Sequence, residues 1–199
     1  AGLSGGSAWA QTVEVANVKY EPSVDLAGQK LVLNGAGIRY KFVVKVYTAG
    51  LYLTHKARST AEVLSTPGPK RIHIQMLRDI DGNELGKLFT KGIEANVTRD
   101  EFAKSINGVL KLSEVFASRK QLNSGDTFSV DYVPGIGSTL LVEPAASFPR
   151  LARRARSLLA LGYSARNLSY AALVRCCSAH FHSASSRSSR ICSAALPSG

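Results

Sequence analysis

The chain has 199 residues, of which 45% are hydrophobic, and a formal net charge of +11. This length is enough for one domain whose core needs no disulfide or metal to stabilise it. The charge is uneven, because residues 1–143 hold 17 Lys and Arg against 14 Asp and Glu, whereas residues 144–199 hold eight Arg and no acidic residue. A basic excess confined to one end does not describe a nucleic-acid-binding domain, so we expect no nucleic-acid partner.

The cysteines follow the same division. Cys176, Cys177 and Cys192 all lie in the basic end, so residues 1–143 offer no thiolate for a disulfide or a metal. His73 alternates with apolar residues, which predicts a surface position on the polar face of a strand. We therefore expect no metal and no other cofactor. The sequence also has no apolar run of about 18 residues, so we expect no transmembrane segment.

The first residues resemble the end of a signal peptide. Ala8-Trp9-Ala10, directly before Gln11, fits the small-x-small pattern that signal peptidase cleaves. We therefore interpret residues 1–10 as the remnant of a signal peptide. The pattern predicts an exported protein, and we expect it to be periplasmic.

Residues 12–53 are rich in β-branched and aromatic side chains, which favour strands. Asn34-Gly35 and Gly37 predict a turn in this region, and residues 41–47 predict a long strand with one buried face. Residues 70–77 alternate with a period of two, and residues 127–133 and 138–143 flank a Pro-Gly turn, which indicates a hairpin.

Three capping patterns predict helices between these strands. Ser59, Asp81 and Thr98 each precede a glutamate by three residues, which is typical of a helix start. The apolar stripes of the two longer helices are Leu85, Leu88, Phe89 and Ile93 in the first, and Phe102, Ile106, Val109 and Phe116 in the second. Strands, then helices, then a hairpin predict an α+β domain over residues 11–143, with an antiparallel sheet and helices packed on one face.

The composition changes at Pro144. Of the 56 residues from there to the end, 12 are Ser, 12 are Ala, eight are Arg and seven are Leu. A soluble segment that natural selection maintains seldom contains arginine without any Lys, Asp or Glu. We therefore expect residues 144–199 to be a disordered tail or the product of a shifted reading frame. The alternative is an Arg/Ser arm that binds RNA or acidic partners.

Two groups of residues carry a resemblance to a known family. Asn34-Gly35-Ala36-Gly37-Ile38-Arg39 precedes Lys45-Val46-Tyr47-Thr48-Ala49-Gly50-Leu51-Tyr52-Leu53, and Gly125–Tyr132 with its Pro-Gly hairpin follows in the same order. This combination resembles the chalcone isomerase-like family over residues 12–143, and looks most similar to its bacterial exported branch. The resemblance implies an open-faced β-sandwich in which helices cover a large sheet and leave an apolar cleft.

The resemblance also implies a site. Some members of this family close a chalcone into a flavanone, whereas others bind fatty acids and catalyse nothing. Arg39 stands at the position that matches the cleft arginine of the family. A guanidinium suits this place, because it stays charged and offers a planar fork of donors to a carboxylate or an enolate.

The other matching positions depart from the enzymes. Either Tyr47 or Thr48 occupies the position of a threonine, and only one of them can face the cleft because successive strand residues point to opposite sides. Phe102 and Val109 stand where the enzymes have tyrosine and asparagine. These two side chains would line an apolar cleft but donate no hydrogen bond.

The sequence therefore predicts a non-catalytic binder of a small hydrophobic or amphipathic ligand such as a fatty acid. The predicted ligand-binding residues are Arg39, Tyr47, Thr48, Phe102 and Val109. The alternative is an intramolecular lyase or isomerase acting on a chalcone-like enone, with Arg39 as its catalytic residue. Both interpretations leave the oligomeric state open.

Overall fold

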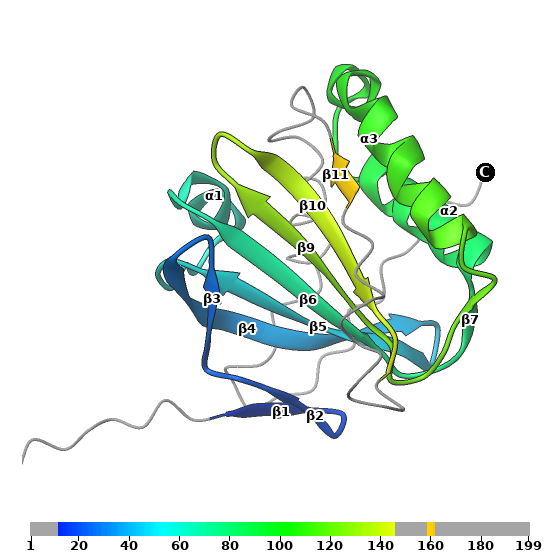
Figure 1. The fold of residues 1–199 in the computed structure, drawn as a ribbon, viewed down its shortest axis with the longest axis horizontal. Helices are drawn as coiled ribbons and strands as arrows, with labels where there is room; N and C mark the ends of the chain where they lie inside the picture. The colour runs from blue at the N-terminus through cyan, green and yellow to red at the C-terminus, as the bar shows by residue number, and fades with distance from the viewer. Residues whose placement is uncertain (1–11, 146–158, 162–199) are drawn as a thin grey trace, which may run out of the picture.

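A seven-stranded antiparallel sheet lies at the centre of the computed structural model, which describes residues 12–145 and 159–161 (Figure 1). The strands follow the order β11-β10-β9-β6-β5-β4-β3 across the sheet. Their bounds are Ser23–Leu26 for β3, Gln29–Lys41 for β4, Val44–Leu53 for β5, Lys70–Met76 for β6, Thr127–Val133 for β9, Gly137–Glu143 for β10 and Leu159–Leu161 for β11.

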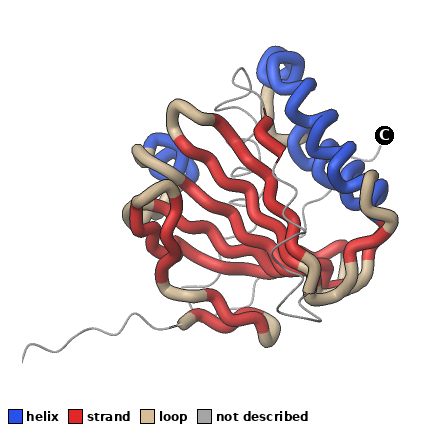
Figure 2. Tube along the Cα trace, in the orientation of Figure 1, coloured by secondary structure: helices blue, strands red, loops and turns tan. Residues whose placement is uncertain are grey.

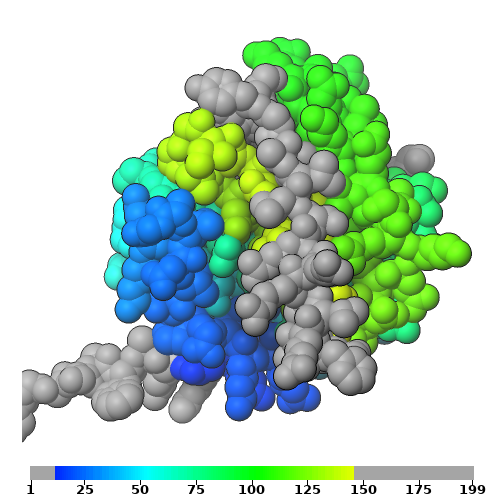
Figure 3. All heavy atoms as spheres, viewed as in Figure 1, coloured from blue at the N-terminus to red at the C-terminus, as the bar shows by residue number. Residues whose placement is uncertain are grey.

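Two longer helices, α2 (Gly82–Glu94) and α3 (Arg99–Ala117), run side by side against one face of this sheet (Figures 1 and 2). In the space-filling view they form one flank of the molecule, in green, beside the strands (Figure 3). A short helix, α1 (Thr60–Ser65), joins β5 to β6. The predicted α+β architecture is thereby confirmed.

Two small sheets complete the described structure. β1 (Val13–Val15) pairs with β2 (Val18–Tyr20), and β7 (Ile80–Asp81) pairs with β8 (Gln121–Leu122). The β7–β8 pair ties the start of α2 to the end of α3. A Cβ atom on Gly82 would lie 2.0 Å from the Arg119 carbonyl oxygen, so only glycine allows this close approach.

Each helix begins where its capping pattern predicts. The side chains of Ser59, Asp81 and Thr98 each accept a hydrogen bond from the backbone N–H three residues further on. At Thr98 the hydrogen bonds form a complete capping box, because the Glu101 side chain also accepts a hydrogen bond from the Thr98 backbone N–H at 2.9 Å. These bonds satisfy donors that the first turn of a helix leaves unpaired.

The predicted turn at Asn34-Gly35 and Gly37 is wrong. These residues lie inside β4, where a register shift between Leu33 and Gly35 marks a bulge. Glycine within a strand often marks a bulge, so the Asn34-Gly35 pair indicates a bulge here and not a turn. The chain turns later, at Phe42 and Val43, between β4 and β5, so the predicted long strand over residues 41–47 is wrong as well.

The predicted stripe of α3 is partly wrong. Ile106 is 36% exposed, whereas Leu112 and Val115, absent from the prediction, are buried. The buried positions of α3 recur at intervals of three and four residues, which defines one helical face and leaves Ile106 on its flank. They are Ser105, Gly108, Val109, Leu112, Val115 and Phe116.

The described chain includes little of the predicted tail. The backbone N–H of Ala145 donates to Asp126 Oδ1 at 2.6 Å, and β11 pairs with β10 at the edge of the sheet. The rest of residues 144–199 lies outside the described residues, as does the Ala8–Ala10 pattern. Among the helices that the structure describes, none is long and apolar enough to cross a membrane.

Candidate ligand site between the sheet and the helices

Arg39 and Tyr47 face each other across β4 and β5 as register partners. The Tyr47 ring stacks on Phe89 of α2, with 6.2 Å between ring centroids and 12° between ring planes. Tyr47 therefore projects toward the helices. Because directly opposed strand residues project from the same face, Arg39 belongs to the helix-covered face as well.

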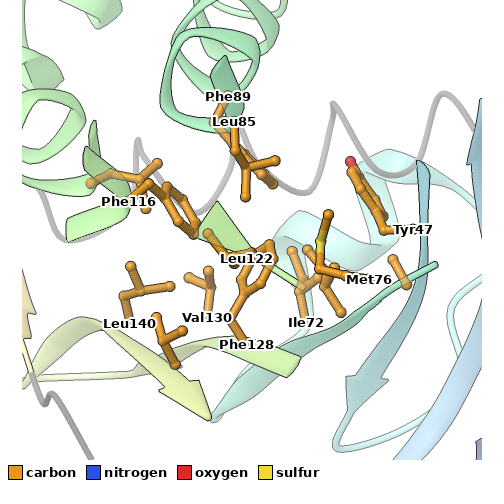
Figure 4. Close-up of a cluster of buried hydrophobic side chains, with 14 of the residues drawn as sticks. Tyr47, Ile72, Met76, Leu85, Phe89, Phe116, Leu122, Phe128, Val130 and Leu140 are labelled. Atoms are coloured by element: carbon orange, nitrogen blue, oxygen red, sulfur yellow. The ribbon is translucent and has the colours of Figure 1, made fainter. Parts of the chain in front are cut away.

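An aromatic cluster continues inward from Tyr47. Phe89 stacks on Phe116 at 5.5 Å, and Phe128 of β9 meets Phe116 edge to face at 5.1 Å. Figure 4 shows these rings together, with the Tyr47 hydroxyl at the end of its ring that lies toward the helices. Tyr47 thus lies at one end of a buried aromatic cluster, and its register partner Arg39 lies on the same face of the sheet.

Phe102 and Val109 belong to the same apolar region. Val109 is buried in the cluster between sheet and helices, and Phe102 packs against that cluster while remaining partly exposed. Neither side chain has a polar atom. The structure therefore brings four of the five predicted residues, Arg39, Tyr47, Phe102 and Val109, to one side of the sheet.

Thr48 lies on the other side. It is fully buried, and its Oγ1 accepts a hydrogen bond of 2.8 Å from the Tyr20 hydroxyl. The Tyr20 ring packs so closely over Gly50 that a Cβ atom there would lie 2.5 Å from it. Tyr47 and Thr48 thus serve opposite faces, and a site under the helices can include only Tyr47.

Charged and polar pairs from β6 and β9 lie on the same face as Thr48. Arg71 forms two hydrogen bonds of 2.6 Å with the carboxylate of Asp131, in the two-pronged geometry that makes such pairs strong. His73 Nδ1 lies 3.0 Å from the Ser129 hydroxyl oxygen. Both pairs join register partners of adjacent strands.

The surface position predicted for His73 is wrong. Its ring is half-buried and meets the Tyr20 ring edge to face at 6.2 Å. Burial lowers the pKa of His73, and the Arg71 charge lowers it further. The alternation in β6 correctly separated His73 from the apolar face. It could not reveal that Tyr20, far away in sequence, packs over this second face.

The tyrosines on this face are held as protonated donors. Burial raises the pKa of Tyr52 to about 12 and raises that of Tyr20 still further above its ordinary value. The Tyr52 hydroxyl donates to the backbone oxygen of Glu21 at 3.1 Å. Both tyrosine hydroxyls therefore remain protonated at physiological pH, and both rings belong to a second buried apolar cluster on this face.

The described residues contain no group of three His, Cys, Asp or Glu side chains close enough to hold a metal ion. The candidate site therefore consists of a guanidinium, a phenol and apolar side chains. Such a set can hold a small anion at one end and a hydrocarbon at the other.

Comparisons with known proteins agree with this fold. An antiparallel sheet with helices over one face defines an α+β domain of the open-faced sandwich class. A family model described as chalcone isomerase-like matches residues 12–147, and the chain belongs to that family.

One similar solved structure is a fatty-acid binding protein of Arabidopsis thaliana. It superimposes with a TM-score of 0.57 at 11% sequence identity, covering 82% of this chain and 87% of that one. At this identity the similarity establishes the fold alone. A search of curated protein sequences found no match.

Proposed function

We propose that this chain binds a small amphipathic ligand, such as a fatty acid, without transforming it. The observation that carries the proposal is that Arg39 and Tyr47 are paired on the helix-covered face, where Tyr47 joins the apolar cluster between the sheet and the helices. The Arg39 guanidinium would hold a carboxylate through charge-assisted hydrogen bonds. The hydrocarbon chain would lie along the apolar side chains of α2 and α3.

The chemistry of α3 favours binding over catalysis. Closing a chalcone requires donors that stabilise the phenolate and the developing enolate, and removing one such donor commonly costs 10²-fold or more in rate. Phe102 and Val109, at the two matching positions, offer none. A fatty-acid binding protein of the same fold is consistent with this assignment.

Native mass spectrometry of the full chain purified from its own host tests the proposal. We expect a co-purifying acyl ligand in the wild type. We also expect Arg39→Ala to weaken the binding of added palmitate about tenfold or more, the value of a charge-assisted hydrogen bond.

The matched control is Arg58→Ala, because Arg58 is exposed and follows the opposite end of β5. This variant should bind palmitate like the wild type. The proposal fails if the wild type carries no acyl ligand and palmitate affinity is the same in all three proteins.

The alternative function is intramolecular cyclisation of a chalcone-like enone. The specific observation in its favour is that Arg39 and Tyr47, a cation and a hydroxyl, stand side by side on one face. Cyclisation of a hydroxychalcone with and without protein decides between the two functions. A protein-dependent acceleration that Arg39→Ala abolishes would establish the enzyme and overturn the purely binding role.

We further propose that the protein belongs to the exported bacterial branch of its family and acts in the periplasm. The Ala8-Trp9-Ala10 pattern supports this proposal. Amino-terminal sequencing of the protein recovered from its host tests it. A mature chain that begins at Gln11 in a periplasmic fraction is expected, and a chain that retains Ala8–Ala10 would contradict it.

A further inference from the structure

The turn between β4 and β5 exposes a group of apolar side chains. Phe42 and Val43, at the tip, are 89% and 90% exposed, and Tyr40 and Val44 beside them are 46% and 42% exposed. Single exposed apolar residues are ordinary on a protein surface. Four within five positions of one protruding turn instead indicate a contact surface.

The backbone of this turn strengthens that interpretation. Phe42 has a φ of 56°, in the left-handed region that bulky side chains seldom adopt and that glycine or asparagine adopts readily. A phenylalanine therefore costs more than glycine at this position and contributes almost no packing to the fold. Its presence is explained if the ring has a partner outside the protein.

Two lysines flank the exposed apolar residues. Lys41 Nζ lies 2.7 Å from Glu84 Oε1, but both side chains are about half-exposed, so the pair is weak and readily exchanged. Lys45 is also exposed, and within residues 12–145 it has no acidic partner. The hairpin thus has an apolar tip with a lysine on each side, Lys41 and Lys45.

We propose that this hairpin docks on an anionic lipid bilayer. Phe42 and Val43 enter the boundary between headgroups and acyl chains, while Lys41 and Lys45 remain at the level of the phosphates. The same hairpin carries Arg39 and Tyr47 a few residues behind the tip, which sets the candidate ligand site close to the membrane surface. Membrane docking is tested without any fatty acid, so it stands or fails separately from the proposed ligand.

The β9–β10 turn provides a matched control within the same chain. Ile136 at its tip is 67% exposed, yet residues 131–139 include no lysine or arginine. If exposure of an apolar side chain were enough for docking, this turn would enter the membrane as well. The proposal predicts that it does not.

Depth-dependent quenching measures the insertion directly. The chain has one tryptophan, Trp9, so Phe42→Trp and Ile136→Trp in a Trp9→Phe background each give a single reporter. Vesicles of phosphatidylcholine and phosphatidylserine carry bromine on their acyl chains. We expect bromine to quench the Phe42→Trp reporter and not the Ile136→Trp reporter. Equal quenching of both, or quenching of neither, overturns the proposal.

Vesicle partitioning gives the second measurement. Relative to the wild type, Phe42→Ser/Val43→Ser should partition about tenfold less, because two apolar side chains lose their burial. Lys45→Gln should partition about fivefold less, the effect of one cation near an anionic surface. Ile136→Ser should match the wild type. The Arg-rich tail is the same in every variant, so the variants differ only at the named positions.

Two further results would overturn the proposal. One is a Phe42→Ser/Val43→Ser variant that partitions like the wild type. The other is a wild type that self-associates in lipid-free solution and becomes monomeric in this variant, since the tip would then be a protein interface. Circular dichroism confirms folding, which these exposed positions should leave unchanged.

Discussion

The two faces of the central sheet are made by the same strands but differ in chemistry. Toward the helices, β5 and β6 present apolar residues such as Ala49, Leu51 and Ile74, which form one cluster with α2 and α3. On the other face the same strands present Thr48, Arg71 and His73 among others, each with a specific hydrogen-bonding partner.

This difference separates two sources of stability. The helix-covered face stabilises the fold through a large buried apolar area. The other face combines a smaller buried apolar cluster with individual hydrogen bonds whose loss leaves a partner unsatisfied in a partly buried place. Substitutions on the two faces should therefore differ in size and kind.

The largest effect is expected on the apolar face. Phe116 is fully buried and contacts both Phe89 and Phe128, so Phe116→Ala should lower the free energy of unfolding by about 3–5 kcal/mol. Phe42→Ala, at an exposed phenylalanine, should change it by less than about 0.5 kcal/mol. Urea denaturation measures both. Similar costs for the two variants would show that the aromatic cluster is not the core.

The next effect concerns the ion pair of the polar face. Asp131→Asn should cost about 2 kcal/mol, because it leaves the Arg71 guanidinium partly buried without its carboxylate. The control is Glu84→Gln, which removes the exposed partner of Lys41 and should cost under about 0.5 kcal/mol. Equal losses in the two variants would contradict a structural role for Arg71–Asp131.

The hydroxyl pair of Tyr20 and Thr48 should show coupling. Thr48→Val leaves the buried Tyr20 hydroxyl without its acceptor and should cost about 1–2 kcal/mol. Adding Tyr20→Phe should recover most of this loss, because both partners are then apolar. A double-mutant cycle measures the coupling, and strictly additive losses would argue against it.

The same Thr48→Val variant also tests which face of the sheet binds the ligand. If the ligand lies under the helices, its palmitate affinity should equal that of the wild type. A loss of affinity comparable to that of Arg39→Ala would place the site on the polar face instead.

The smallest effect depends on pH. The pKa of His73 is lowered in the folded chain, so the unfolded chain takes up its proton first as the pH falls. Above pH 6.5, the ordinary pKa of histidine, His73 is neutral in both states and does not affect the free energy of unfolding. Below that pH the free energy of unfolding decreases until the pH reaches the lower pKa of His73 in the folded chain.

His73→Gln should flatten this decline relative to the wild type. Urea denaturation from neutral pH down to mildly acidic pH measures both slopes. Identical slopes in His73→Gln and wild type would contradict the burial of this ring.

Local patterns predicted much of this domain. The three N-caps depend on residues within one turn of each other, and the alternation in β6 depends on neighbours two positions apart. Such short-range rules operate before any long-range contact forms. The motifs around Arg39 and Tyr47 likewise indicated the family, which the match over residues 12–147 confirms.

Long-range pairing decided the rest. The Asn34-Gly35 pair is compatible with a turn or with a bulge, and only the pairing of β4 with β5 selects the bulge and moves the turn to Phe42 and Val43. The environment of His73 depends on Tyr20, which lies 53 positions earlier in the chain.

By itself, then, the sequence determined the helix starts, the β9–β10 hairpin, the family and the alternation of buried and partly exposed residues in β6. Only the tertiary structure decided that Tyr47 faces the helices while Thr48 is bonded to Tyr20 behind the sheet. Adjacent strand residues must face opposite sides, but which side the helices cover depends on contacts between segments far apart in the chain.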